Sequence, residues 1–196
     1  MIVLKIFKCV FADILYLICG KRLKAVISAD VDRYLKWNKK IGNKKNRVLR
    51  LDYLLVSKPD FRSVFYFRTA RHKILTALSG LLLPRAKSIE FDGEIGGGLM
   101  VSHYHSVICP KSAGRNLRVG PGAVICGDDG APVIGDNVYV ASNSCIIGNI
   151  HIGDNVIIGA GSVVKDDLAG NAVYVGNPAR FIKNIDGNEA LLNEIM

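Results

Sequence analysis

The chain has 196 residues, of which 49% are hydrophobic, and a formal net charge of +9 at pH 7. This length suffices for one core with an appendage, and the hydrophobic content excludes a disordered chain. The charge is unevenly divided, because residues 1–90 hold 20 Lys and Arg against 6 Asp and Glu, whereas residues 91–196 hold 6 against 11. We therefore expect a basic N-terminal segment, residues 1–87, followed by a mildly acidic domain.

The first nineteen residues are strongly apolar but are interrupted by Lys5, Lys8 and Asp13. A membrane-spanning helix needs about 20 predominantly apolar residues, and three charges in the window argue against one. No cleavage site of small residues follows, so a secretory signal is not indicated. We expect a helix that packs between subunits, with a helix lying on a membrane surface as the alternative.

Between Asp30 and Leu78 the pattern predicts helices that are broken near Gly42 and Pro59. The basic runs at residues 21–24 and 39–47 could face an anionic membrane, a phosphate-bearing substrate, nucleic acid or only water. No nucleic-acid-binding motif is present, so we expect no nucleic-acid partner. Peripheral membrane contact through residues 1–50 stays open.

Five cysteines show neither a pairing pattern nor a Cys-x-x-Cys motif. An odd number of such cysteines, without a clear secretory signal, indicates reduced thiols. We therefore expect a cytoplasmic protein, and association with the inner face of a membrane stays open.

From Ile95 onward the sequence repeats every six residues. Each hexad opens with a branched aliphatic residue or alanine, and a small or aliphatic residue stands four places later. The opening residues are Ile95, Val101, Val107, Ala113, Val119 and Ile125, then Ile134, Val140, Ile146, Ile152, Ile158 and Val164. The step from Ile125 to Ile134 puts three extra residues into Gly127–Pro132, whose composition is typical of a turn. A fixed period of this kind predicts a solenoid, because ordinary strands would be irregularly spaced.

Three segments resemble the hexapeptide-repeat acyltransferases, chiefly the serine acetyltransferases and the sugar O-acetyltransferases of bacterial capsule synthesis. They are residues 95–103 (IGGGLMVSH), residues 130–138 (GAPVIGDNV), and residues 158–164 (IGAGSVV) with 176–180 (GNPAR). The resemblance implies a mainly β fold, a left-handed parallel β-helix over residues 88–172. A short α-helical segment, residues 1–87, would precede it, and a tail, residues 173–196, would follow. It also implies a homotrimer with active sites between subunits.

Acyl transfer from a thioester to a hydroxyl needs a base, and histidine titrates near the working pH. The resemblance aligns His103 with the catalytic histidine of the family. We expect the glycines at 96–98 to leave space for a ligand beside it. His105 falls at the inward position of its hexad and is a structural residue, a contact between subunits or a contact to the substrate.

The resembled family has a carboxylate fifteen residues before the histidine, which orients the imidazole. This chain has Ser88 at that position. Glu90 and Asp92 are the nearest carboxylates of the same strand parity, and we expect Glu90 to orient His103. Ser88 or a backbone carbonyl is the alternative, and Asp92 is a candidate substrate contact.

The resemblance implies acetyl-CoA as co-substrate, bound in a groove between two coil stacks. Ala141, Gly159 and Ala160 would let its pantetheine arm bond to the backbone. Arg180 and Lys183 match the basic tail that meets its phosphates in the family, where charge-assisted contacts form.

The expected function is therefore O-acetyl transfer from acetyl-CoA to a hydroxyl. The serine enzymes have a long loop with His and Arg where this chain has only residues 126–130, so we favour a sugar of a surface or capsular glycan as acceptor, with serine as the alternative. A non-catalytic scaffold would not need His103, Arg180 or Lys183. Zinc enzymes of the γ-carbonic anhydrase kind need three histidine ligands, and the histidine pattern here does not supply them, so we expect no metal.

Overall fold

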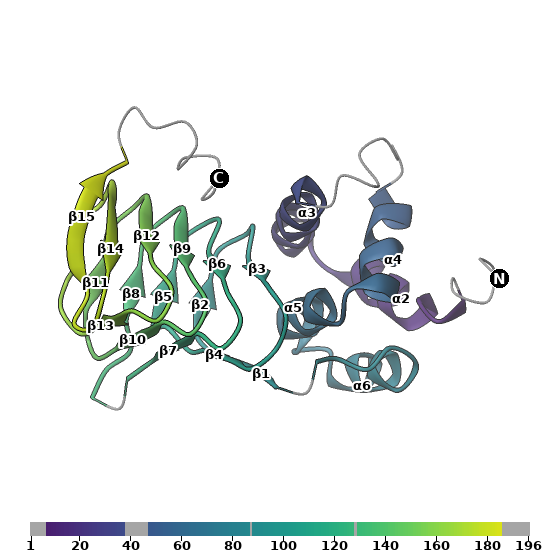
Figure 1. Cartoon of the computed structure of the whole chain (residues 1–196). Helices are drawn as coiled ribbons and strands as arrows, with labels where there is room; N and C mark the ends of the chain where they lie inside the picture. Colours follow the sequence, from purple (N-terminus) through teal and green to yellow (C-terminus); the bar gives the residue numbers. More distant parts are fainter. Residues whose placement is uncertain (1–6, 38–46, 87, 128, 186–196) are drawn as a thin grey trace. The chain divides into compact units, whose positions relative to one another are not determined.

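The computed structural model describes residues 7–37, 47–86, 88–127 and 129–185. The chain divides into two compact units, Met1–Lys87 and Ser88–Met196, the first helical and the second built of short strands (Figure 1). The expected break near Gly42 and the charge at Lys5 lie outside the described residues.

The helical unit contains five described helices. They are α2 (Val10–Ile18), α3 (Lys21–Lys36), α4 (Arg47–Ser57), α5 (Pro59–Thr69) and α6 (Lys73–Leu82). The predicted break at Pro59 is confirmed: Lys58 is extended, as the residue before a proline prefers, and Pro59 opens α5, where its missing N–H costs nothing. Phe61 and Phe65 are completely buried at the centre of the unit, and Tyr34 packs edge-on against Phe61.

Two carboxyl groups meet inside this unit. Asp13 of α2 and Asp52 of α4 share a side-chain hydrogen bond, and Asp52 is buried. Burial, and then the charge of Asp52, raises the pKa of Asp13 to about 7. Burial also raises the pKa of Asp52. The two groups therefore do not both ionise readily at neutral pH.

The second unit is a solenoid whose successive strands enter three sheets in rotation. The first sheet holds β1 (Ile89–Phe91), β4 (Ser106–Ile108), β7 (Val124–Cys126), β10 (Cys145–Ile147) and β13 (Val163–Val164). The second holds β2 (Glu94–Ile95), β5 (Ser112–Ala113), β8 (Val133–Ile134) and β11 (His151–Ile152). The third holds β3 (Met100–Val101), β6 (Arg118–Val119), β9 (Val138–Val140), β12 (Val156–Ile158), β14 (Ala172–Val175) and β15 (Arg180–Asn184).

Every pair of neighbouring strands in these sheets is parallel except β14 and β15. Three strands make one coil, so the expected parallel β-helix is confirmed. The pairing of Cys145 with Val163 shows the regular step of eighteen residues per coil. The pairing of Val124 with Cys145 spans twenty-one. The three additional residues lie where the sequence predicted them, at residues 127–132.

The hexad openers form the core of the solenoid with one exception. Val107 is half-buried, and its neighbour Ile108 is completely buried instead. Four residues, 102–105, separate the buried Val101 from the buried Ser106, whereas a regular corner such as 120–122 has three, so Ser106 takes the inward place. The predicted inward position of His105 is therefore wrong: His105 is exposed.

The corner between the second and third sheets carries a ladder of asparagines. Asn116, Asn137, Asn155 and Asn171 have left-handed backbones, with φ between 56° and 63°. The side-chain N–H of each donates to the side-chain oxygen of the next, at 2.8, 2.9 and 2.8 Å. Asparagine tolerates this conformation better than most residues, so one residue type both turns the chain and links the coils.

After β14 the chain reverses through residues 176–179, and β15 returns antiparallel to β14, with Val175 opposite Arg180. This strand is the last in the third sheet. Within the described part of the chain, no helix combines the length and the apolar character that crossing a membrane requires.

Candidate functional site

One corner of the solenoid gathers most of the residues that the sequence singled out. It joins the third sheet to the first, and we name it the active corner. Its consecutive turns are residues 102–105, 120–122, 141–143 and 159–161, and the reversal at residues 176–179 lies next to the last of them, where Gly176 N donates to Ser162 Oγ. Backbone hydrogen bonds stack them: Ser102 N donates to Val119 O at 2.8 Å and Gly120 N to Val140 O at 2.8 Å. Ala141 N donates to Ile158 O at 2.9 Å, which continues the stack.

His103 lies in the turn at one end of this stack, and Arg180 follows the turn at the other end. Ala141, Gly159 and Ala160 lie in between. The coils of His103 and Ala160 are three apart, which is about 14 Å at the usual spacing of parallel strands. A ligand that contacts both must therefore be extended.

The turn of residues 102–105, which we name the histidine turn, departs from the other turns of the active corner. His103 and His105 both have left-handed backbones, with φ of 66° and 65°. The next three turns each have one such residue, Gly122, Asn143 or Gly161. Histidine enters this conformation more readily than most side chains, yet a strained backbone costs of order 1 kcal/mol or more. Strain that exposes two imidazoles motivates a functional hypothesis for the turn.

Contacts from both neighbouring coils hold the histidine turn. Ser88 Oγ accepts a hydrogen bond from His105 N at 3.2 Å, and Ser88 O accepts one from Ser106 N at 3.0 Å. On the other side, Ser106 Oγ donates to Gly120 O at 3.2 Å. Ser88, which stands where the resembled family has its carboxylate, thus supports the backbone of the turn that carries His103.

Glu90 and Asp92 lie along β1 and the residue after it, leading away from the histidine turn. Glu90 pairs with Val107, and Asp92 N donates to Ile108 O at 3.0 Å. Both side chains are exposed. Burial raises the pKa of the Cys109 thiol, and the negative charges of Asp92 and Glu90 raise it further, so both carboxylates lie near Cys109. Among the described residues no hydrogen bond joins either carboxylate to His103. The orienting role of Glu90 and the substrate contact of Asp92 stay predictions.

The small residues of the active corner differ in what surrounds them. A Cβ added to Gly159 would lie 2.7 Å from Cγ2 of Val175, so packing explains that glycine. Ala160 and Gly161 are exposed, and a Cβ added to Gly161 would meet nothing within 4 Å. The accessible backbone of this turn is therefore at 160–161. Ala141 is buried.

The basic residues at the far end of the active corner are accessible. The Arg180 side chain is 66% exposed, and the carboxylate of Asp166 lies 3.9 Å from it. Lys183 is exposed three residues further along β15. A pair at this distance and exposure is weak in water, so the Arg180 guanidinium is accessible to an anionic ligand.

The positions of Gly96 and Gly98 offer no space for a ligand. A Cβ on Gly96 would lie 2.6 Å from Gly114 O, and a Cβ on Gly98 would lie 2.3 Å from Asn116 Oδ1. These glycines let one coil approach the next, rather than making room for a ligand. No cluster of three or more His, Cys, Asp or Glu that could hold a metal ion occurs in the described ranges.

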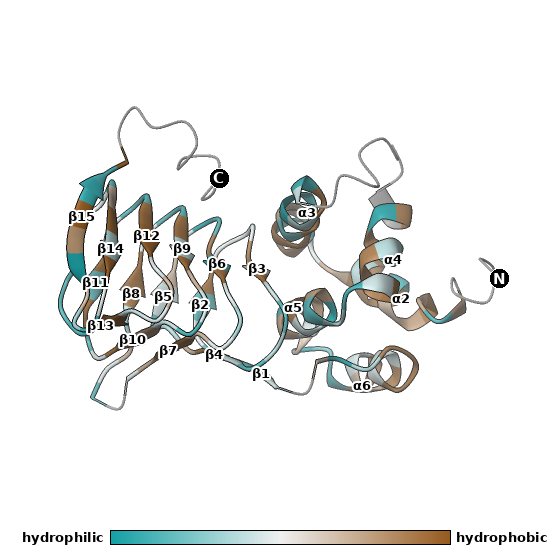
Figure 2. Ribbon diagram, viewed as in Figure 1, coloured by the Kyte–Doolittle hydropathy of each residue, from teal (hydrophilic) through white to brown (hydrophobic). Residues whose placement is uncertain are grey.

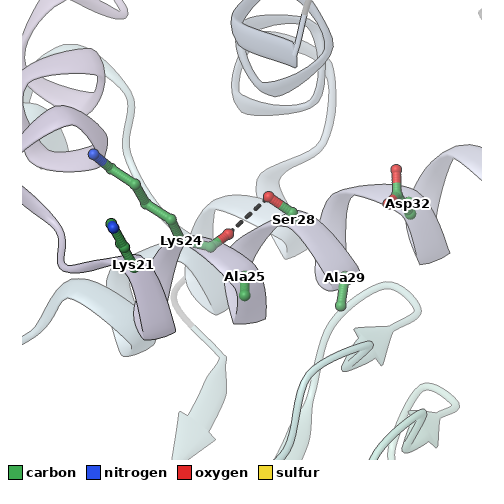
Figure 3. Close-up of a pocket in the computed structure, with 6 residues that line it drawn as sticks. All are labelled: Lys21, Lys24, Ala25, Ser28, Ala29 and Asp32. Atoms are coloured by element: carbon green, nitrogen blue, oxygen red, sulfur yellow. Dashed lines mark hydrogen bonds between the residues drawn. The ribbon is translucent and has the colours of Figure 1, made fainter.

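The helical unit contains an open pocket that involves none of the predicted site residues (Figure 3). It is lined by Lys21, Lys24, Ala25, Ser28, Ala29 and Asp32, all from α3. Ser28 Oγ donates to Lys24 O at 2.7 Å, within the helix itself. The pocket therefore presents few unengaged polar groups, and we assign it no role in the reaction.

The comparisons with known proteins agree on the repeat and on the fold. Residues 131–166 match the family described as bacterial transferase hexapeptide (six repeats). Serine acetyltransferase 3, mitochondrial, of Arabidopsis thaliana is 35% identical over 128 residues, 60% of this chain and 32% of that protein. The chain thus spans about a third of the length of that relative.

Among solved structures, the serine acetyltransferase of Neisseria gonorrhoeae superposes with a TM-score of 0.67 at 23% identity, covering 88% of this chain and 69% of that one. The serine acetyltransferase of Brucella abortus in complex with coenzyme A has a TM-score of 0.59 at 20% identity, covering 86% and 71%. At these identities the likeness concerns the fold. It agrees with the left-handed parallel β-helix that the sequence resemblance implied.

Proposed function

We propose that this hexapeptide-repeat protein transfers an acetyl group from acetyl-CoA to a hydroxyl, with His103 as the base. The observation that carries the proposal is the active corner, which puts His103, the exposed backbone at 160–161 and Arg180 along one stacked edge. The relative named serine acetyltransferase and the similar structure solved with coenzyme A support the same chemistry.

In the proposed step the imidazole of His103 takes the proton of the acceptor hydroxyl. The freed oxygen forms a bond to the thioester carbonyl carbon, and the carbon–sulfur bond then breaks. The imidazolium returns its proton to the departing thiolate, so the products are an acetyl ester and the thiol of coenzyme A. The exposure of His103 leaves the ring accessible to both substrates.

Coenzyme A would lie along the active corner in an extended form. Its pantetheine arm would contact the backbone at Gly159 and Ala160, with Ala141 in the coil below. Arg180 and Lys183 would pair with its phosphates, which both bear the opposite charge and accept hydrogen bonds. This arrangement follows from the accessible backbone and the exposed basic groups of the corner.

Serine is the acceptor that we propose, because the Arabidopsis relative and the similar solved structures bear the name of serine acetyltransferase. This choice replaces the glycan sugar that the sequence favoured first. A sugar is the second candidate, because residues 126–130 are short where the resembled serine enzymes have a long loop. We also propose a homotrimer with the site between subunits. None of the five cysteines, all of which lie in the described ranges, forms a disulfide, and we propose a reducing, cytoplasmic location.

The test measures release of coenzyme A thiol from acetyl-CoA with serine or nucleotide-linked sugars as acceptors. His103→Ala should lower turnover on the order of 100- to 10,000-fold, the usual contribution of a positioned base. His151→Ala is the matched control, because His151 is also exposed but lies on the second sheet. Turnover by His103→Ala within about threefold of wild type would exclude His103 as the base.

The same assay separates the alternatives. Turnover with serine and not with sugars supports the serine acceptor, and the reverse result supports the second candidate. A protein that neither binds coenzyme A nor releases its thiol with any acceptor would instead be the non-catalytic scaffold. Light scattering that shows a stable, active monomer would exclude the trimer.

A further inference from the structure

The helical unit exposes an apolar face on α2 and α6, which we name the α2–α6 face. Leu17 of α2 is 65% exposed, and Ile74 and Leu81 of α6 are 77% and 79% exposed. The complete face consists of Phe7, Val10, Ile14, Leu17 and Ile18 from α2 and the turn before it, with Ile74, Leu81 and Leu82 from α6. The steps of three and four residues along α2 put these side chains on one side of the helix.

The two exposed stripes belong to neighbouring helices. Helices α2 and α6 are in contact. They run in opposite directions. The end of α2 lies near the start of α6, because the positive charge of Arg71, before α6, acts on the thiol of Cys19, after α2. At the other end, Cys9 before α2 lies near Tyr66, whose hydroxyl bonds to Leu83 O after α6. Figure 2 shows the apolar colouring of both helices. Large exposed apolar patches on soluble proteins mark surfaces of interaction.

The charge of the unit indicates what kind of partner fits. Residues 1–87 hold 20 Lys and Arg against 5 Asp and Glu. Two of the five acidic residues are buried: Asp52, and Asp30, which pairs with Arg68 at 3.0 Å. Lys8 and Lys73 are exposed next in sequence to Phe7 and Ile74 of the face. The helical unit therefore carries a large net positive charge, and two of its lysines stand beside the face.

We propose that the α2–α6 face docks on an anionic lipid surface. The helices would lie in the plane of the interface, with apolar side chains at the acyl boundary and the Lys and Arg side chains among the phosphate headgroups. A second copy of the chain would bring two positive surfaces together, which costs electrostatic free energy. Charge complementarity thus favours the lipid over self-association.

The experiment measures flotation of the full chain with phosphatidylcholine vesicles, with and without phosphatidylglycerol. Wild type should float with the anionic vesicles, less so at high salt because screening weakens the charge contribution. The double variant Leu17→Gln, Leu81→Gln should partition roughly tenfold or more weakly, because two large apolar side chains no longer enter the interface. Both positions are exposed, so the fold should persist, as circular dichroism will show.

Ile182→Gln is the matched control, since Ile182 is 56% exposed on β15 in the other unit. It should float like wild type. Equal flotation of the double variant and wild type would overturn the proposal, as would absence of wild-type flotation with anionic vesicles. Light scattering tests the alternative that the face binds a second copy of the chain. If the double substitution reduces the number of chains per particle and leaves flotation unchanged, the face binds a second copy and the proposal is wrong.

Discussion

Replacing Asp13 with asparagine should stabilise the helical unit at alkaline pH and leave it unchanged at acid pH. Asp13 and Asp52 face each other from α2 and α4, and burial raises the pKa of both. Asparagine has nearly the same shape, carries no charge at any pH, and can donate a hydrogen bond to Asp52. The substitution therefore removes one ionisation and little else.

The sign follows from the pKa of Asp13, which is about 7 in the folded chain against 3.8 for the unperturbed group. The folded state binds the proton more tightly, so stability is fully present below pH 4 and is lost as pH rises from 4 through 7. A shift from 3.8 to about 7 corresponds to roughly 4 kcal/mol at most. Solvent screens part of this because Asp13 is only half-buried, and Asp52 shares the effect, so about 1–2 kcal/mol remains.

The assay is urea unfolding at pH 4.5 and pH 8, followed by the fluorescence of Trp37. This residue is the single tryptophan of the chain, and it lies at the end of α3, so it reports on the helical unit alone. Asp32→Asn is the control, because Asp32 is exposed and pairs with Arg50. If Asp13→Asn is no more stable than wild type at pH 8, or if its effect is the same at both pH values, the carboxyl pair does not behave as described.

Two further predictions concern the proposed reaction. The double variant Arg180→Ala, Lys183→Ala should bind coenzyme A roughly 10- to 100-fold more weakly in calorimetry, because two exposed charge-assisted contacts are lost. The rate of the chemical step should change little. An unchanged dissociation constant would show that the phosphates bind elsewhere. Glu90→Gln should lower turnover at saturating acetyl-CoA if Glu90 orients His103, and should be silent if Ser88 or a carbonyl does so. In the second case Ser88→Asp should raise turnover, and a silent Glu90→Gln with an inactive Ser88→Asp would show that His103 is wrongly aligned with the family's base.

The solenoid could be predicted because its physical requirement repeats. Each coil must bury a residue at the same two places of every hexad, so eleven of the twelve opening positions are buried as counted. The exception is Val107, since its neighbour Ile108 is buried instead. The two residues are adjacent and both aliphatic, so hydrophobicity alone does not predict which of them faces the core. Ser106 could have indicated the shift by one residue, because serine also occupies the buried inward position at Ser144 and Ser162.

The active corner could be predicted in part. His103 and Ala160 stand two places after their hexad openers, and Ala141 and Gly159 stand one place after theirs, so equal spacing is enough to stack their turns on one edge. The role of the glycines at 96 and 98 could not be predicted, because a missing side chain serves close packing of coils as well as it serves a ligand. The position of Glu90 relative to the histidine turn could not be predicted either. It depends on the extra residue of that turn, and counting in hexads does not reveal that residue.

The antiparallel return of β15 ends the third sheet of the solenoid. A parallel solenoid ends in a strand edge that matches the beginning of another coil, and such edges promote end-to-end fibres. Strand β15 covers that edge with a strand of the opposite direction, and its exposed Arg180 and Lys183 repel an approaching positive copy. Polymerisation through the third sheet at this end is thereby opposed.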